Sequence, residues 1–414
     1  MARAKSTPNK ITVEGKNEFA ESEQKRRGFR HEGRRLFILG ILCAVVVFAA
    51  WVLPTYMFDH SQMQFTPAVF INVVAYNFDS LLNVFVAGGQ AGESRFMAVV
   101  VCAVSGAALG MCGSAYQGAF NNPLAAPKTL GIMAGGALGA LIYVLFLQGV
   151  GPKMPGLSSG SYTYAQQLGW LSSLNPFEWL WVNYGKCLCS MAGCFIVVAI
   201  VLALTSAFGR GKLSNVVVII FGQVFAATVT AIISFMRYAS TSAGSIDTAD
   251  ELREIENYTM IQEFHYIDLL IIVLPILICM VVILLMSRRL TLLSFGDDEA
   301  NTMGINVNRT RYALIAVCTI MTAFAISFCG HVAYLGFISA HLARRIVGPN
   351  FRYLLPASLF VGASLLTVIQ YICQSGLPNT SPYSAGVVCS IVGATLFIVI
   401  VLTQRGKAFS GGWR

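Results

Sequence analysis

Long apolar runs that are almost free of charge are the feature that most constrains this chain. Ten runs of about 16 to 25 residues have the length that a hydrocarbon core of about 30 Å requires of a helix. Charged residues make up 11% of the chain, where about 25% is usual in a soluble domain. The sequence therefore predicts an all-α polytopic membrane protein with ten transmembrane helices and excludes a soluble fold. The predicted spans are 36–57, 96–119, 129–149, 187–208, 214–236, 267–287, 312–329, 332–347, 354–373 and 384–403.

The basic residues predict the orientation of these spans. With both termini in the cytoplasm, 23 of the 28 Lys and Arg residues fall on cytoplasmic segments, as the positive-inside rule requires. They form no patch interleaved with aromatic residues, so membrane lipid and not nucleic acid is the predicted partner. The basic residues left on the outer side are Arg95, Lys153, Lys186, Arg237 and Arg253.

The segments outside the spans complete the predicted organisation. Phe65–Gly88 is apolar enough to suggest a further span, but Asn72, Asn77 and Asp79 are costly in hydrocarbon. We therefore predict an interfacial helix on the outer face for this segment. The predicted parts are a basic cytoplasmic extension (1–35), a transmembrane domain (36–404) with outer loops 58–94, 150–186 and 238–266 and a cytoplasmic loop 288–311, and a cytoplasmic tail (405–414).

Eleven cysteines do not point to a disulfide framework or a metal site. Nine lie inside apolar runs, where cysteine behaves as a small hydrophobic residue. Cys187 and Cys189, next to a predicted outer surface, are the pair that the sequence offers for a bridge. No Cys or His spacing typical of a metal site is present, and we predict no catalytic residues in this chain.

The placement of ionisable residues bears on how a transporter of this kind would be energised. Ion-coupled carriers usually keep an ionisable residue at mid-membrane, but Asp268 lies at a span edge and His341 towards the inner end of its span. The chain has no G-x-x-x-x-G-K-[ST] nucleotide motif. The glycines between Gly135 and Gly139 lie in a span, where small residues permit close helix packing. Energy for uphill transport would have to come from another subunit.

The segment Arg288–Arg311 between two spans has the composition of a short helix that is contacted from outside the membrane. We predict that Ser294 caps the start of this helix and that Gly304 provides a left-handed stop. A solvated loop that only joins two spans is the alternative. Asp297, Asp298 and Glu299 place negative charge in the first turn, and Leu293, Phe295, Ala300 and Met303 are left to face the bilayer or a partner.

A second informative stretch runs from Ser105 to Gly139. Closely spaced Gly and Ala residues let helices approach backbone to backbone, and Gln117, Asn121 and Asn122 are polar groups that need partners. Pro123 and Pro127 interrupt the path between two spans. A tight inter-span turn and a role in transport are both consistent with this pattern.

Three motifs, in order along the chain, resemble one family. Gln117-Gly118, Asn122-Pro123-Leu124-Ala125, Pro127 and Leu130-Gly131 match Q-G-x-x-x-N-P-L-A-x-P-x-x-L-G. The segment from Gly296 to Asn306 is similar to G-E-E-x-A-x-x-L-G-V-N, and the segment from Gly336 to Pro356 to G-L-x-x-P-H-x-A-R-x-x-x-G-x-x-x-R-x-L-L-P. With these motifs the chain resembles the permease subunits of iron-siderophore, haem and cobalamin ABC importers, over about residues 36–404.

The resemblance implies a dimer of ten-helix permeases in the bacterial cytoplasmic membrane. It also implies a pair of cytoplasmic ATPases that bind ATP and Mg²⁺, so this chain would bind no cofactor itself, and an extracellular solute-binding protein. Residues 296–304 would be the coupling helix that contacts the ATPase, and span 214–236 would help to line the pathway. By this resemblance the coupling residues are Gly296, Asp297, Asp298, Glu299, Ala300, Met303 and Gly304, the motif turn contains Gln117, Asn122, Pro123, Pro127 and Gly131, the pathway residues are Gln223, Thr228, Thr230 and Ser234, and Arg95 is the retained arginine of an outer docking motif.

The predicted function is therefore that of an importer permease for an iron-siderophore or a related metal chelate. A haem or cobalamin permease is an alternative within the same family. An ion-coupled secondary transporter and a membrane scaffold or receptor are alternatives from other classes. The sequence does not identify the solute, because bulky chelates are bound by shape and scattered polar groups.

Overall fold

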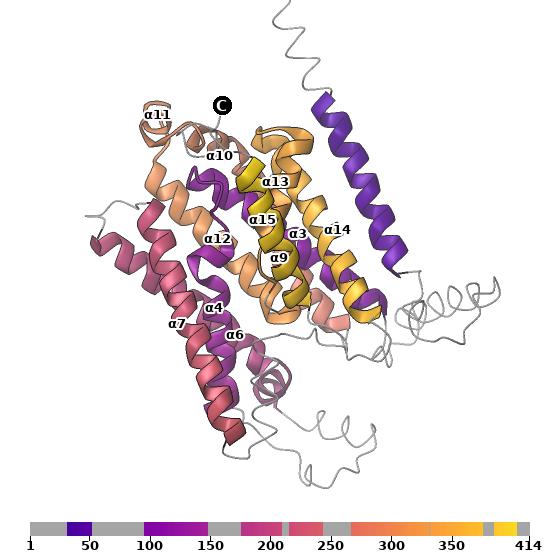
Figure 1. Cartoon of the computed structure of the whole chain (residues 1–414), viewed down its shortest axis with the longest axis vertical. Coiled ribbons are helices and arrows are strands. Elements are labelled where there is room, and N and C mark those ends of the chain that lie inside the picture. The colour runs from indigo at the N-terminus through magenta and orange to yellow at the C-terminus, as the bar shows by residue number, and fades with distance from the viewer. Residues whose placement is uncertain are drawn as a thin grey trace, which may run out of the picture.

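The computed structural model of the chain describes residues 31–51, 95–147, 175–208, 215–242, 266–330, 332–375 and 385–403. These residues form a bundle of helices, and no strand occurs among them (Figure 1). Over its described residues, each of the ten predicted apolar runs lies mainly on helical elements, and the run 129–149 is divided among three of them. The elements are a first helix (His31–Trp51), α3 (Arg95–Ala119), η2 (Pro127–Leu130), α4 (Ile132–Ile142), η3 (Tyr143–Leu147), α6 (Pro176–Phe208), α7 (Asn215–Ser242), α9 (Tyr266–Leu285), α10 (Ser287–Leu293), α11 (Asp297–Thr302), α12 (Val307–Cys329), α13 (Leu335–Val347), α14 (Phe351–Ser375) and α15 (Ala385–Thr403).

Six of the described helices are long and apolar enough to cross a membrane, and α9 with α10 forms a bent pair that makes up to seven. The chain is thus a multi-pass helical membrane protein, and the exact number of ten crossings stays a prediction. Several helices are longer than predicted: the first helix begins at His31, within the predicted extension 1–35, and α12 begins at Val307, within the predicted loop 288–311. α6 begins at Pro176, within the predicted outer loop 150–186, and α7 continues to Ser242, within the predicted loop 238–266.

Several predicted segments lie outside the described residues. They are most of the amino-terminal extension, the loop 58–94 with the predicted interfacial helix Phe65–Gly88, the remaining parts of the other two outer loops, and the tail 405–414. Arg95 is described as the first residue of α3. The docking role predicted for Arg95 stays a prediction.

The helix α3 lies at the centre of the bundle because its small residues allow backbones to touch. A Cβ atom added to Gly113 would lie 2.7 Å from the Cα of Gly336 in α13, and one added to Gly362 of α14 would lie 3.0 Å from the Cα of Gly110. The added Cβ atoms would also overlap the carbonyl oxygens of Gly336 and Gly106, so neither position has room for a side chain. The predicted close packing around Gly106–Gly113 is confirmed, and it is the usual way in which membrane helices associate.

A second contact of the same kind joins α4 to α6. A Cβ atom on Gly135 would lie 3.0 Å from the Cα of Cys194, and one on Gly193 would lie 3.0 Å from the Cα of Gly139. The glycines of α4 therefore serve helix packing, as the sequence predicts. The first helix, in contrast, lies at the edge of the bundle beside α14 (Figure 1), and a Cβ atom added to Gly40 would lie 3.4 Å from the Phe360 ring.

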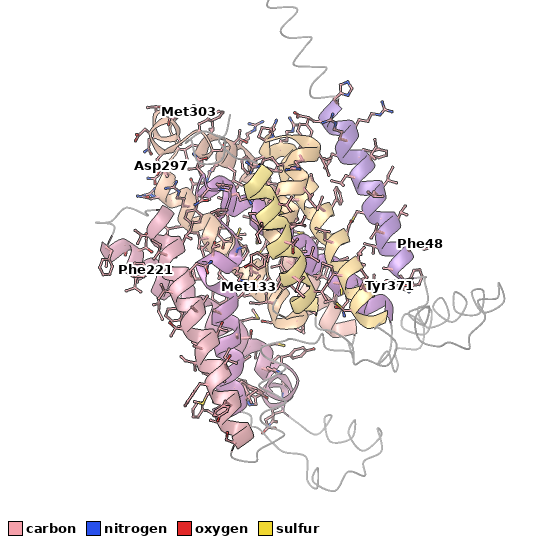
Figure 2. All side chains as sticks on the ribbon, viewed as in Figure 1. Phe48, Met133, Phe221, Asp297, Met303 and Tyr371 are labelled. Carbon is pink, nitrogen blue, oxygen red and sulfur yellow. The ribbon has the colours of Figure 1, made fainter. Side chains whose placement is uncertain are left out.

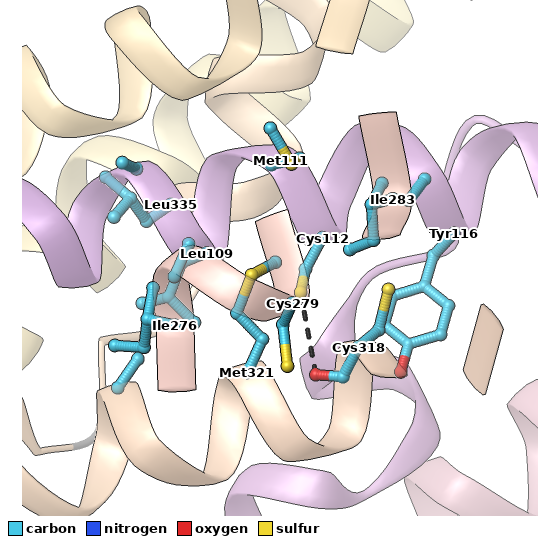
Figure 3. Packing of buried hydrophobic residues seen from close by; sticks show 14 of the residues in the cluster. Leu109, Met111, Cys112, Tyr116, Ile276, Cys279, Ile283, Cys318, Met321 and Leu335 are labelled. Carbon is cyan, nitrogen blue, oxygen red and sulfur yellow. Dashed lines mark hydrogen bonds between the residues drawn. The ribbon is translucent and has the colours of Figure 1, made fainter. Parts of the chain in front are cut away.

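The largest buried cluster includes residues of most of the described helices, and Figure 3 shows the part where α3, α9, α12 and α13 meet. Cys112 of α3 donates a hydrogen bond from Sγ to the Cys318 carbonyl oxygen of α12 at 3.5 Å. All eleven cysteines are free, so the bridge considered for Cys187 and Cys189 is not formed. Cys187 donates instead to the Ser327 carbonyl oxygen at 3.3 Å. The cysteines act as small core residues, as expected from their apolar surroundings.

Candidate functional site

The segment between α9 and α12 projects from one end of the bundle. The helix axis bends by 54° between α9 and α10, and α11 follows after a short turn. Asp297 and Met303 lie at this end, beyond the long helices (Figure 2). We call it the α11 end. It also holds the carboxyl end of α3, whose Ala119 carbonyl is bound by a side chain of α12.

Glycine conformations determine the bounds of α11. Gly296 precedes the helix with φ 125° and Gly304 follows it with φ 82°, conformations that favour glycine over other residues. The predicted stop at Gly304 is confirmed, and Asp297, Asp298 and Glu299 occupy the first turn as predicted. The predicted cap at Ser294 is wrong. The Ser294 hydroxyl donates to the Thr291 carbonyl oxygen at 2.7 Å, at the end of α10, because serine near a helix end readily bonds back to the preceding turn.

The four apolar residues predicted to face the bilayer or a partner divide into two pairs. Leu293 and Ala300 are fully buried and pack with Val307, so they hold α11 against α10 and α12. Phe295 and Met303 are 60% and 50% exposed. The exposed acidic residues of the first turn flank them. The segment thus has one face that anchors it to the bundle and another that is available to a partner.

Arg311 of α12 joins α11 to α3. Its Nη1 and Nη2 atoms donate to Asp297 Oδ2 and Oδ1 at 2.8 and 2.6 Å. Its Nε atom donates to the Ala119 carbonyl oxygen at 2.8 Å. Only 1% of the Arg311 side chain is exposed. Ala119 is the last residue of α3, where helical carbonyls lack an intrahelical partner and the helix carries negative partial charge. The guanidinium therefore satisfies the buried carbonyl end of α3, and its own buried charge is paired with the half-exposed Asp297 carboxylate.

Two of the polar residues of the motif turn, Gln117 and Asn122, accept hydrogen bonds on their side-chain oxygens, whereas Gln117 Nε2 is buried without a partner among the described residues. Gln117 is 2% exposed and accepts a hydrogen bond on Oε1 from Arg344 Nη2 at 3.3 Å. The Asn122 side chain accepts from the Leu124 amide at 2.9 Å, which is an Asx-type turn. Asn121 takes φ 45°, a conformation that asparagine tolerates better than most residues. Pro127 begins η2 and is buried.

The motif turn ends against α7. Gly131 has φ 76°, and a Cβ atom on Gly222 of α7 would lie 2.8 Å from the Cα of Leu130. The Lys128 ammonium lies 4.0 Å from the centre of the Tyr334 ring, a cation–π contact. His341 is buried with its ring 4.4 Å from that of Phe337, so it packs as a core residue of α13.

The predicted pathway residues of α7 do not share one face. Gln223, Thr230 and Ser234 are seven and four residues apart and lie on one side of the helix. Thr228 is turned about 140° from Gln223, because each residue advances the helix by about 100°. It stands among exposed apolar residues, and its hydroxyl donates to the Val224 carbonyl oxygen of its own helix. Those apolar neighbours are Val224, Ile232 and Phe235.

Comparison with known proteins places this geometry in a family. The sequence matches the FecCD transport family over residues 36–403. The chain belongs to this family. It is 24% identical over 319 residues to the cobalamin import system permease protein of Halobacterium salinarum, covering 77% of this chain and 74% of that protein. It is 27% identical over 318 residues to the hemin transport system permease protein of Yersinia pestis, covering 75% and 82% of the two chains.

Two further similarities support the family assignment. The ferric enterobactin transport system permease protein of Escherichia coli is 27% identical over 318 residues, which are 76% of this chain and 83% of that protein. A solved structure described as an inward-facing conformation of a metal-chelate type ABC transporter superposes with a TM-score of 0.63 and 21% identity. It covers 90% of this chain and 99% of the other. The helical arrangement is therefore shared with that solved transporter.

Sequence reasoning missed two features of the site. Arg311 was counted only as a cytoplasmic charge, although it is an almost fully buried link between α11 and α3. Its position in the second turn of an apolar helix, four residues inside Val307, was a signal that it needed a buried partner. Gly222 was not singled out either. Its place in an otherwise bulky run, Val217–Phe221 before it and Gln223-Val224-Phe225 after it, was the available signal.

Proposed function

We propose that the chain is the permease subunit of an ATP-driven importer of an iron-siderophore or a related metal chelate. Haem and cobalamin remain the alternative substrates, because permeases for each occur among the similar proteins. The observation that carries the proposal concerns the α11 segment, which we define as residues 293–307. One face of this segment is buried against the bundle and another face is exposed. Leu293 and Ala300 fix it to the bundle, and Phe295 and Met303 remain exposed at its surface.

The topology proposed for the chain has ten crossings with both termini in the cytoplasm. The charges of the described residues support the α11 end as the cytoplasmic side, because exposed arginines cluster there. Arg288 and Arg289 of α10, Arg345 of α13 and Arg352 of α14 are all exposed at this end. The protein would lie in the bacterial cytoplasmic membrane.

The partners proposed follow from this topology. A pair of cytoplasmic ATPases, which hold ATP and Mg²⁺, would contact α11 and its flanking residues through Phe295, Gly296, Asp298, Glu299, Met303 and Gly304. Of the other predicted coupling residues, Asp297 is bound to Arg311 and Ala300 is buried against the bundle. A second permease, identical or related, would complete the pathway, and an extracellular solute-binding protein would dock on the side where Arg95 begins α3. The polar face of α7 with Gln223, Thr230 and Ser234 would line the pathway, and Thr228 would lie apart from it.

The contact with the ATPase is tested by removing the exposed apolar surface of α11. In the double variant Phe295→Ala/Met303→Ala, we expect copurification of the ATPase and ATP-dependent uptake to fall about tenfold or more, since exposed aromatic and Met anchors dominate such interfaces. The matched control is Phe48→Ala on the first helix, which is also exposed but distant from α11 (Figure 2). It should leave both measurements unchanged.

Uptake into vesicles that contain the complete complex also distinguishes the substrates and the energy source. Uptake of ferric enterobactin, haem and cyanocobalamin is measured with the complete complex, with and without ATP. Uptake that persists without ATP and follows an imposed ion gradient would support a secondary transporter. Full ATPase association of the double variant would contradict the assignment of α11.

A further inference from the structure

We propose that Arg311 and the part of the motif turn from Ala119 to Gly131 form the mechanical link that carries a displacement of α11 to α7. The inference rests on the proposed function, in which an ATPase moves α11 and α7 lines the pathway. It assigns the motif turn a role that the sequence left open between a simple connection and transport. Arg311 is a positioning residue in this link and contacts no solute.

The first joint is the guanidinium of Arg311. It holds the first residue of α11 by two charge-assisted hydrogen bonds and the last carbonyl of α3 by a third. Paired N–H groups fix direction as well as distance. Lysine could not replace it, because one ammonium lacks the planar fork that reaches both acceptors. A movement of Asp297 is therefore imposed on Ala119, although 192 residues separate Ala119 from Arg311 in the chain.

The second element is the turn itself, which is braced along its length. The Asn122 amide donates to the Gln117 carbonyl oxygen at 3.2 Å, and the Ala125 amide donates to the Asn122 carbonyl oxygen at 3.2 Å. Thr129 then accepts from the Ala126 amide at 2.9 Å and donates to the Ala126 carbonyl oxygen at 2.7 Å. Successive bonds of this kind leave little room for the turn to absorb a displacement by bending.

The third element is the backbone contact between η2 and α7. Gly222 faces Leu130 without a side chain between them, and Gly131 faces the Gly222 carbonyl oxygen, 3.1 Å from an added Cβ atom. Closely packed surfaces transmit displacement because they have no compressible gap. Gln223 follows directly, so the contact acts on the helix turn where the polar face of α7 begins.

The packing of the helices places the turn between α11 and α7. α11 packs mainly against α10 and α12, whereas α7 packs mainly against η2, α4 and α6. α12 also packs directly against α4 and α6, so the substitutions tested below distinguish the turn from that second route. Arg344, which bonds Gln117 at the start of the turn, adds a brace from α13.

The test measures how α11, the motif turn and α7 each respond to nucleotide in the complete complex with its ATPase. Hydrogen exchange is measured by mass spectrometry on peptides from α11, the turn and α7, without nucleotide and after trapping with ATP and vanadate. In the native complex we expect nucleotide to change exchange in all three. In Arg311→Met the change in α11 should persist, while the change in the turn and in α7 falls about fivefold or more, the lower range of ordinary coupling factors.

A second substitution, at the contact between η2 and α7, tests the order in which a displacement passes through the three elements. Gly222→Ala inserts a methyl group between η2 and α7, so the responses of α11 and the turn should persist and the α7 response alone should fall. The matched controls are Arg309→Met, an exposed residue of the same helix turn as Arg311, and Gly33→Ala, whose added Cβ meets nothing within 4 Å. Both should show the native pattern.

The outcomes separate this inference from the proposed function. If Arg311→Met does not fold, Asp297→Asn tests the same joint, since the Asp297 side chain is half exposed and tolerates a neutral isostere. An α7 response that stays native in either variant overturns the link. A native complex in which nucleotide leaves α11 unchanged would instead contradict the proposed coupling of α11 to the ATPase.

Discussion

The helices α3 and α7 are both apolar enough to cross a membrane, yet they occupy opposite situations in the bundle. The apolar stretch of α7 has the higher mean hydropathy of the two. Only 22% of its residues are buried inside the protein, against 78% of the residues in the apolar stretch of α3. In a soluble protein the ranking would be the reverse. The difference shows that in this chain hydropathy indicates what can face lipid and does not indicate what forms the core.

Residue size explains the contrast. Lipid tails are as apolar as leucine, so a bulky apolar side chain gains little by moving from lipid into the protein. Close backbone approach gains dispersion contacts instead, and only small residues permit it. α3 carries Gly106, Gly110 and Gly113 on contacts with α13 and α14. α7 has Gly222 at η2 and otherwise exposes bulky residues such as Val224 and Phe235.

The largest effect is expected where α3 touches α13. Gly113→Ala should lower the free energy of unfolding by about 1–3 kcal/mol, because an added methyl overpacks a backbone contact that cannot open locally. The measurement is thermal unfolding in nanodiscs. Gly33→Ala in the first helix is the matched control. Its Cβ meets nothing within 4 Å, so it should be neutral or stabilising by up to about 1 kcal/mol through helix propensity.

The next test compares the same substitution on the polar face and on the apolar face of α7. Thr230→Val should reduce ATP-driven uptake about fivefold, the value of one hydrogen bond of about 1 kcal/mol. Thr228→Val makes the same chemical change on the apolar side and should leave uptake near native. Uptake of the best transported member of the ferric enterobactin, haem and cyanocobalamin panel is measured in vesicles. Equal losses in both variants would show that the polar face does not line the pathway.

The smallest effect is expected on the exposed apolar side of α7. Ile232→Ala should change the free energy of unfolding by less than about 0.5 kcal/mol, as at most surface positions, because lipid replaces the lost contacts. Val229→Ala, on the buried side of the same helix at 2% exposure, should lower it by about 1–2 kcal/mol. Thermal unfolding in nanodiscs measures both. A loss in Ile232→Ala as large as that in Val229→Ala would show that another protein surface covers this side.

Much of the candidate site was predictable because its signals are local. Gly304 stops α11 where the sequence predicts, and the acidic residues occupy the first turn. The failure at Ser294 has a specific cause. A serine at that position can cap the following helix or bond back to the preceding one, and the glycine at 296 with φ 125° allows the chain to turn without a side-chain cap.

The division between Leu293 and Ala300 on one side and Phe295 and Met303 on the other was not predictable. All four are apolar, and a segment of six helical residues is too short for periodicity to separate a buried face from an exposed one. The packing of Val307 against the segment decides which residues are covered.

The sequence by itself determined that the chain is embedded in a membrane, which family it belongs to, and where the α11 segment and the motif turn lie. These properties follow from the lengths of apolar runs and from residues whose backbone preferences act locally. The tertiary structure alone decided that α3 is central and that Arg311 bridges Asp297 and Ala119. Those outcomes depend on contacts between residues far apart in the chain, and neither hydropathy nor spacing contains the geometry of such contacts.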